Sequence, residues 1–83
     1  MLYTEVSYTI HSETGMYKAG TIGLTHDRSL NNSAIKRFLR RSLDKDQKTF
    51  KIHIITNEAM SEEVALQRYG NKLVDIIRRR RFR

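Results

Sequence analysis

The sequence contains no cysteine and no proline among its 83 residues. Without cysteine the chain can form neither a disulfide nor a cysteine-ligated zinc site. Without proline, no helix is sharply interrupted. No apolar run approaches the roughly 20 residues of a membrane-spanning helix, and no signal-peptide pattern is visible. We therefore expect a cytoplasmic protein that does not enter a membrane.

The length indicates one domain. A chain of this size buries only about 60% of its unfolded surface and is marginally stable by itself, so a bound partner or dimerisation would stabilise it. We expect a compact domain over residues 1–79 and an arginine-rich tail over residues 80–83.

The balance of charge is strongly basic. Sixteen Lys and Arg residues against nine Asp and Glu residues give a net charge of +7 and a pI near 10.2. Such a charge favours a polyanionic partner, either nucleic acid or an acidic protein surface. The alternative is a solvated surface that only keeps a small protein soluble, but here the charge is clustered rather than scattered.

Strict alternation of side chains predicts a strand over residues 2–10. Residues 12–15 have the composition of a turn that ends in glycine, so a hairpin follows. The second strand is expected over residues 16–25, where Gly20 and Gly23 would mark a bulge or an edge. A third strand is expected over residues 50–56.

Two amphipathic helices are predicted. The first is capped by Asn31 or Asn32, and its apolar stripe is formed by Ile35, Phe38, Leu39 and Leu43. The second begins after Ser61 and runs to Arg78 or Arg79. Its apolar side would comprise Ala65, Leu66, Tyr69, Leu73, Ile76 and Ile77.

The resulting order, ββαβα, predicts an α+β two-layer sandwich. A three-stranded antiparallel sheet in the order 2-1-3 would carry both helices on one face. The opposite face would then be open and would display Tyr3 and Tyr17. Sheet-based single-strand binders stack bases on such aromatics. An ordinary solvated sheet face, or dimerisation through this face or its edge strand, are the alternatives.

Two basic clusters are candidates for contacting phosphates or an acidic partner. Arginine suits bidentate contact with phosphate and stacking on bases, and Phe82 adds a stacking group within the second cluster. The candidate binding residues are Lys36, Arg37, Arg40 and Arg41 of the first helix, Lys72, and Arg78, Arg79, Arg80, Arg81 and Arg83 at the end of the chain. If both helices lay on one sheet face, the two clusters could share one surface.

No pattern of an enzyme is apparent. His11, His26 and His53 do not show metal-ligand spacing. No serine sits in a nucleophile elbow, and the four glycines make no phosphate-binding loop. We expect no catalytic residue, no cofactor and no metal.

One resemblance concerns three short runs, at residues 3–7, 31–34 and 54–58. Together they resemble the opening part of ribonuclease H-type domains, which have a hairpin, a helix and a strand ending in an acidic motif. The resemblance implies metal-binding carboxylates at three places. Only Glu5 matches; Ile35 or Lys36 stands near the helix acid, and Asn57 replaces the strand acid. Two-metal chemistry needs several converging carboxylates, so the resemblance implies a shared arrangement of elements rather than activity.

The leading hypothesis is a small non-enzymatic protein that binds the nucleic-acid backbone through its basic clusters. The alternative is a small accessory or inhibitor protein, of the type encoded by phages and mobile elements, that binds an acidic site on a larger host protein.

Overall fold

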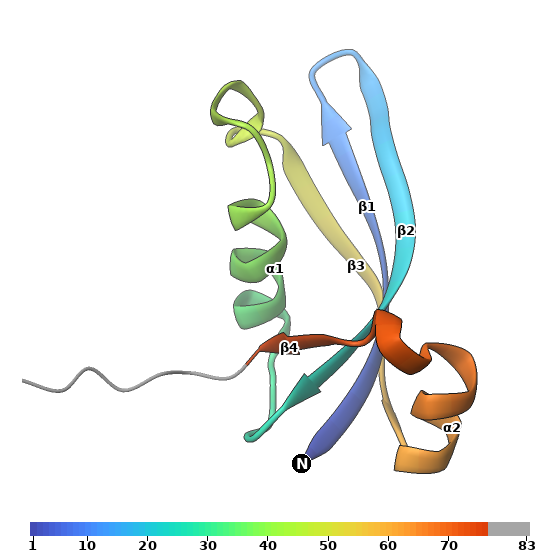
Figure 1. Ribbon diagram of the computed structural model, residues 1–83. Helices are drawn as coiled ribbons and strands as arrows, with labels where there is room; N and C mark the ends of the chain where they lie inside the picture. The colour runs from blue at the N-terminus through green and yellow to red at the C-terminus, as the bar shows by residue number, and fades with distance from the viewer. Residues whose placement is uncertain (77–83) are drawn as a thin grey trace, which may run out of the picture.

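The structure, a computed structural model, describes residues 1–76 of the chain (Figure 1). Its elements are β1 (Leu2–Ser12), β2 (Gly15–His26), α1 (Asn32–Arg41), η1 (Lys45–Gln47), β3 (Lys51–Met60), α2 (Glu62–Arg68), η2 (Gly70–Lys72) and β4 (Val74–Ile76). The predicted α+β class and the two helices are confirmed.

Within residues 1–76 the sheet has four strands in the order β3-β1-β2-β4. β1 pairs antiparallel with both β2 and β3, as the predicted order 2-1-3 requires. The prediction of a three-stranded, wholly antiparallel sheet is wrong, because β4 pairs parallel with the end of β2, from Leu24 to His26. β3 is also longer than predicted: Asn57, Glu58 and Ala59 continue the ladder with β1.

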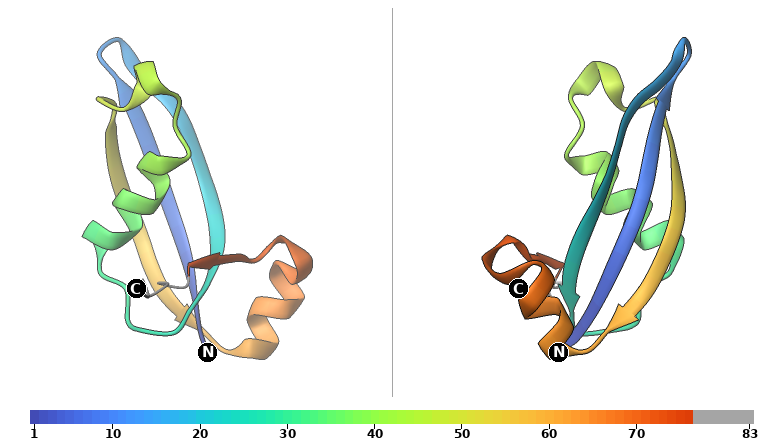
Figure 2. Two further views of the ribbon diagram at one scale, coloured as in Figure 1. Left: turned by 60° about the vertical axis from the view of Figure 1, so that its left-hand side comes forward. Right: turned by 90° about the vertical axis from the view of Figure 1, so that its right-hand side faces the viewer.

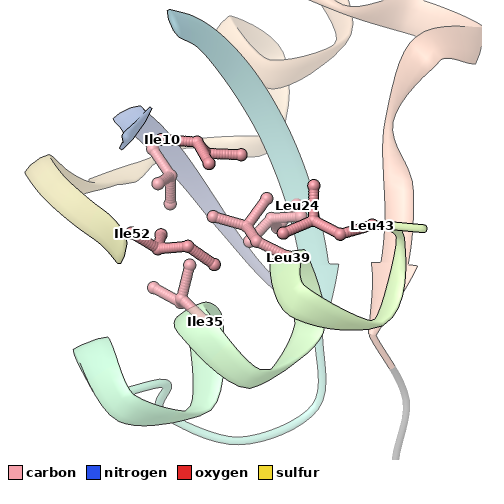
Figure 3. Packing of buried hydrophobic residues seen from close by; sticks show 7 residues of the cluster. Ile10, Leu24, Ile35, Leu39, Leu43 and Ile52 are labelled. Carbon is pink, nitrogen blue, oxygen red and sulfur yellow. The ribbon is translucent and has the colours of Figure 1, made fainter. Parts of the chain in front are cut away.

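The core lies between α1 and one face of the sheet, which we call the inner face. Val6 and Ile10 of β1 point to this face and are buried with Leu24 of β2. The predicted stripe of α1 packs onto them, as Figure 3 shows for Ile35 and Leu39. Burial of these side chains removes apolar surface from water, which is the main force that holds α1 to the sheet.

The second helix is much shorter than predicted. It ends at Arg68, with Tyr69 as its C-cap, and Gly70 follows with a φ of +54°. Glycine adopts this left-handed conformation without the steric cost borne by other residues, so it commonly ends helices. The prediction of a helix to Arg78 or Arg79 is therefore wrong, and Leu66, assigned to its apolar side, is 52% exposed.

The two helices lie on opposite faces of the sheet, which corrects the prediction that both cover one face (Figures 1 and 2). Glu5 alternates with the buried Val6 and therefore points to the outer face. Its carboxylate accepts hydrogen bonds from Arg68 and Tyr69 at the end of α2. α2 covers only one end of the outer face, beside the end of β2.

β4 brings the chain back to the inner side. Its side chains Val74 and Ile76 pack against the cluster that contains Leu24 and Leu39. On the other side of β4, Asp75 accepts a hydrogen bond from the hydroxyl of Thr25. The described chain therefore ends at Ile76 in contact with the same core that α1 covers.

Two β-bulges change which face the side chains point to. The register of β1 with β2 shifts between Ile10 and His11, which leaves Tyr17 as the extra residue. The register of β1 with β3 shifts between Ser7 and Tyr8, which leaves Ile55 as the extra residue. Each bulge reverses the relation between sequence parity and sheet face.

Candidate nucleic-acid interface

The solvent side of α1 carries basic residues and no acidic ones. Asn31 caps the helix by accepting a hydrogen bond from the amide of Ala34 at 2.8 Å, as one of the two predicted caps. Lys36, Arg37 and Arg41 are exposed. Basic groups near the last turn also oppose the negative end of the helix dipole, so this end tolerates the positive charge.

Arg40 differs from the other basic residues of α1. Its Nη1 donates to the carbonyl oxygens of Lys48 at 2.5 Å and Phe50 at 2.8 Å. In return, Nζ of Lys48 donates to the carbonyl oxygen of Arg40 at 2.7 Å. Arg40 is half-buried. It holds the loop after α1 against the helix and is a weaker candidate for contacting a ligand than its neighbours.

The loop between α1 and β3 adds two lysines to the basic residues of the helix, but its two aspartates leave it without net charge. Lys45 and Lys48 are exposed in it, together with Asp44 and Asp46. The sequence indicated only a solvated loop here. The contact between Lys48 and Arg40 that joins this loop to α1 could not be recognised from the sequence, because it depends on the path of the folded loop.

Tyr17 lies beside this loop and not on the open outer face where it was predicted. Its ring contacts Phe50 edge-to-face at 5.2 Å between centroids, and its hydroxyl accepts a hydrogen bond from Gln47 at 2.7 Å. Tyr17 as a whole remains 49% exposed. Lys18, which follows it, is exposed and paired with the inner-face residue Ile10. The bulge at Tyr17 causes the change of face.

Tyr3 stays on the outer face, where it is half-buried between Thr25 and Met60 of the neighbouring strands. The two predicted stacking tyrosines are thus on opposite sides of the sheet, and the prediction that they share one face is wrong. Tyr17 is the one that the structure brings close to basic residues.

Lys72 is separated from the α1 cluster. It lies in η2, next to Leu73, whose side chain approaches Gly23 from the outer side of the sheet together with Tyr69. Lys72 therefore does not share a surface with the basic residues of α1, as it would if both helices lay on one face of the sheet. Arg78, Arg79, Arg80, Arg81, Phe82 and Arg83 lie outside the described residues.

We call the exposed lysines and arginines on the inner side of the sheet the basic surface. It is composed of Lys36, Arg37, Arg41, Lys45, Lys48 and Lys18, with Tyr17 as its aromatic member.

Glu5, the carboxylate singled out by the ribonuclease H resemblance, is engaged by α2. Its Oε2 accepts from the Tyr69 hydroxyl at 2.7 Å and from Arg68 Nη1 at 3.1 Å. The hydrogen bond from Tyr69 and the charge of Arg68 lower the pKa of Glu5. Burial and the neighbouring carboxylate raise the pKa of Tyr69 to about 12. The carboxylate therefore ties α2 to the sheet.

His26 is also structural. It is 3% exposed, and its Nδ1 donates to the carbonyl oxygen of Arg28 at 2.5 Å while Nε2 lies 2.7 Å from the hydroxyl of Thr4. It lines one side of an open pocket of about 740 Å³ between the start of β1 and the end of β3, whose other walls include Leu2, Leu30 and Met60.

The other two histidines, His11 and His53, touch on the outer face with ring centroids 5.1 Å apart. Within residues 1–76, no group of three or more histidine, cysteine or acidic side chains could hold a metal ion. No helix in the same range is long and apolar enough to cross a membrane.

No family model, no curated protein and no solved structure matches this chain.

Proposed function

We propose that this protein binds the backbone of a nucleic acid through the basic surface, assisted by the arginines that follow β4. The observation that carries the proposal is the solvent side of α1, which presents Lys36, Arg37 and Arg41 without an acidic residue in the helix. Cations on a rigid helix can be held at fixed spacings along a phosphate chain, and arginine can contact a phosphate with two parallel hydrogen bonds.

Tyr17 favours binding of single-stranded nucleic acid, whose bases can stack on an exposed aromatic ring. Its exposed ring offers a face for base stacking, which does not depend on base identity. Phe50 and Gln47 hold the ring in place, so little rotamer entropy is lost when a base stacks on it. Both features favour binding that tolerates many sequences.

The path of β4 supports a role for the C-terminal arginines. Val74 and Ile76 pack against the core under α1, and Arg78 is the second residue after Ile76. The C-terminal arginines therefore follow, in the sequence, a strand whose side chains contact the same core that α1 covers.

The test is fluorescence anisotropy with labelled single- and double-stranded DNA and RNA over a series of salt concentrations. The full chain is compared with a chain ending at Ile77 and with the variant Arg37→Ala/Arg41→Ala. We expect both changes to weaken binding similarly for all base sequences. Each lost phosphate contact should reduce the slope of log K against log salt by about 0.7 for single strands or 0.9 for duplexes.

Lys36→Ala and Lys72→Ala form a matched pair, because both remove one exposed lysine but only Lys36 belongs to the basic surface. We expect Lys36→Ala to weaken binding more than Lys72→Ala. Equal effects would contradict the assignment to α1. Binding that is alike for every polymer and disappears at moderate salt would contradict the nucleic-acid role and favour an acidic protein partner for the same surface.

A further inference from the structure

β3 forms one edge of the sheet and pairs, within the described residues, only with β1. It is ten residues long. Its extra residue, Ile55, is 62% exposed at the middle of the strand. A long edge with an exposed apolar residue is a template for pairing with another strand.

The direction of the backbone groups along this edge follows from Ser7, whose amide points toward β3 and donates to Thr56 Oγ1 at 3.3 Å. Along a strand, successive residues direct their N–H and C=O groups alternately to either side. Asn57, next after Thr56, therefore directs its groups to the free edge. Ile10 is three residues after Ser7, so its backbone N–H and C=O point away from β3 and toward β2. Ile52 lies opposite Ile10, and its backbone groups therefore also point to the free edge.

The bulge makes this edge self-complementary. Lys51 is opposite His11 and Glu58 is opposite Glu5, so both lie on the outer face. In a regular strand, two residues an odd number of positions apart would point to opposite faces. The extra residue Ile55 removes that conflict, and antiparallel pairing of two β3 strands can place Lys51 opposite Glu58 with both side chains on the outer face.

Charge favours this register. Glu58 is directly opposite Glu5 within the chain, an unfavourable like-charge pair in a sheet. Arg68 forms an ion pair with Glu5 at 3.1 Å, whereas no ion pair within residues 1–76 involves Glu58. A lysine from another chain would supply the missing cation.

We propose that two copies of this chain form a symmetric dimer by antiparallel pairing of their β3 strands, with Lys51 opposite Glu58 of the partner subunit. Ile52 is then opposite Asn57 of the partner subunit, and their outward backbone groups exchange hydrogen bonds. Lys51 and Glu58 of the partner subunit form the adjacent, non-hydrogen-bonded pair. In such a pair the two side chains are closer together than in a hydrogen-bonded pair. Symmetry makes each contact occur twice.

The dimer would contain one continuous eight-stranded sheet. Its two-fold axis is perpendicular to the sheet, so both α1 helices lie on the same face. The interface thereby joins two basic surfaces into one, although the pairing itself does not depend on what they bind.

Sedimentation equilibrium over a concentration series tests the proposal through charge reversal. Lys51→Glu and Glu58→Lys should each raise the dimer dissociation constant roughly tenfold or more, because each creates two like-charge contacts. The double variant Lys51→Glu/Glu58→Lys should restore dimerisation. Lys18→Glu, an equal change on the opposite edge, should leave it unchanged. Circular dichroism of each variant verifies folding.

Disulfide formation tests the register, since the chain has no cysteine of its own. The variant Lys51→Cys/Glu58→Cys should oxidise to a covalent dimer, because directly opposite Cα atoms are close enough for a disulfide. His53→Cys/Glu58→Cys, which reports a register shifted by two residues, should not. A monomer at every concentration, or a dimer whose dissociation constant does not change on charge reversal, would overturn the proposal. Lys51 and the bulge would then serve to prevent β3 from pairing with other strands.

Discussion

At the scale of single residues, the contact between Tyr69 and Glu5 connects the C-terminal quarter of the chain to the first strand. The hydroxyl donates to the carboxylate at 2.7 Å, and the ring lies over Gly23 of β2. The hydrogen bond requires a protonated tyrosine and an ionised glutamate. Stability should therefore depend on pH at both ends of the scale.

For Tyr69, the pKa of the folded state is about 12, above the ordinary value of 10.0. Its contribution to the free energy of unfolding is therefore complete below pH 10 and is lost as the pH rises toward 12. For Glu5 the folded pKa lies below the ordinary 4.5, so its contribution is complete above that value and is lost in acid. Urea unfolding at a series of pH values measures both.

Tyr69→Phe should lower the free energy of unfolding by about 1 kcal/mol at neutral pH and remove this alkaline loss. Tyr17→Phe is the control, since its hydroxyl bonds to the amide of Gln47 rather than to a carboxylate. An unchanged alkaline loss in Tyr69→Phe would show that another group causes it.

Gly23 is the second decisive residue, because it allows Tyr69 and Leu73 to approach β2. A Cβ at this position would lie 2.7 Å from Tyr69 Cγ and 3.0 Å from Leu73 Cδ2. We expect Gly23→Ala to destabilise the protein by about 1–3 kcal/mol, measured by thermal or urea unfolding. Gly20→Ala, which would meet only the hydroxyl end of Tyr8 at 2.9 Å, should cost less. The reverse order would contradict the packing.

At the scale of elements, α1 and its following loop behave as one unit because of Arg40. Arg40→Ala should lower the free energy of unfolding by about 1–2 kcal/mol, since two charge-assisted bonds to loop carbonyls are lost. Arg37→Ala removes the same side chain from an exposed position and should leave stability within about 0.5 kcal/mol. Similar losses for both would show that helix propensity, not the loop contact, explains the effect.

The sequence predicted well those elements whose pattern reflects one buried face. The alternation of β1 and the spacing of Ile35 and Leu39 each require a single periodicity, and the structure has both. The end of α2 was missed because Tyr69 and Leu73 fit a helical stripe, although they reach the sheet from irregular backbone. Gly70 followed by Asn71 was the available signal for a helix end.

Part of the candidate site could not be predicted, because it depends on bulges and on strand pairing. Tyr17 was assigned a face by counting residues, and one extra residue in the hairpin reversed that assignment. The exposure of Lys36, Arg37 and Arg41 followed from helix geometry alone. The engagement of Arg40 depends on where the loop passes, which local pattern does not encode.

At the scale of the whole molecule, the two sheet faces have different coverings. α1 covers the inner face along much of its length, whereas α2 covers one end of the outer face (Figure 2). Between them the chain passes the edge of β2, where β4 pairs with the end of β2. β4 thus connects the two sides of the sheet: it follows α2 in the chain, and its side chains pack against the core that α1 covers.

β4 also has a consequence for the order in which the protein folds. β4 forms three residue pairs with β2, and the two residues of each pair are fifty positions apart in the chain, as in Thr25 and Asp75. Bringing these distant segments together costs conformational entropy and gains few contacts. The β1–β2 hairpin and its pairing with β3 reduce that cost once formed. We therefore expect β4 to dock after the rate-limiting step of folding.

Stopped-flow kinetics of Val74→Ala measures this order. With a loss of about 1 kcal/mol, the unfolding rate should rise about fivefold and the folding rate should stay the same. A slower folding rate would instead place β4 in the folding nucleus. The unfolding rate governs how long a native molecule persists. The three residues of β4, the last and shortest strand within residues 1–76, would therefore determine the lifetime of the fold more than its rate of formation.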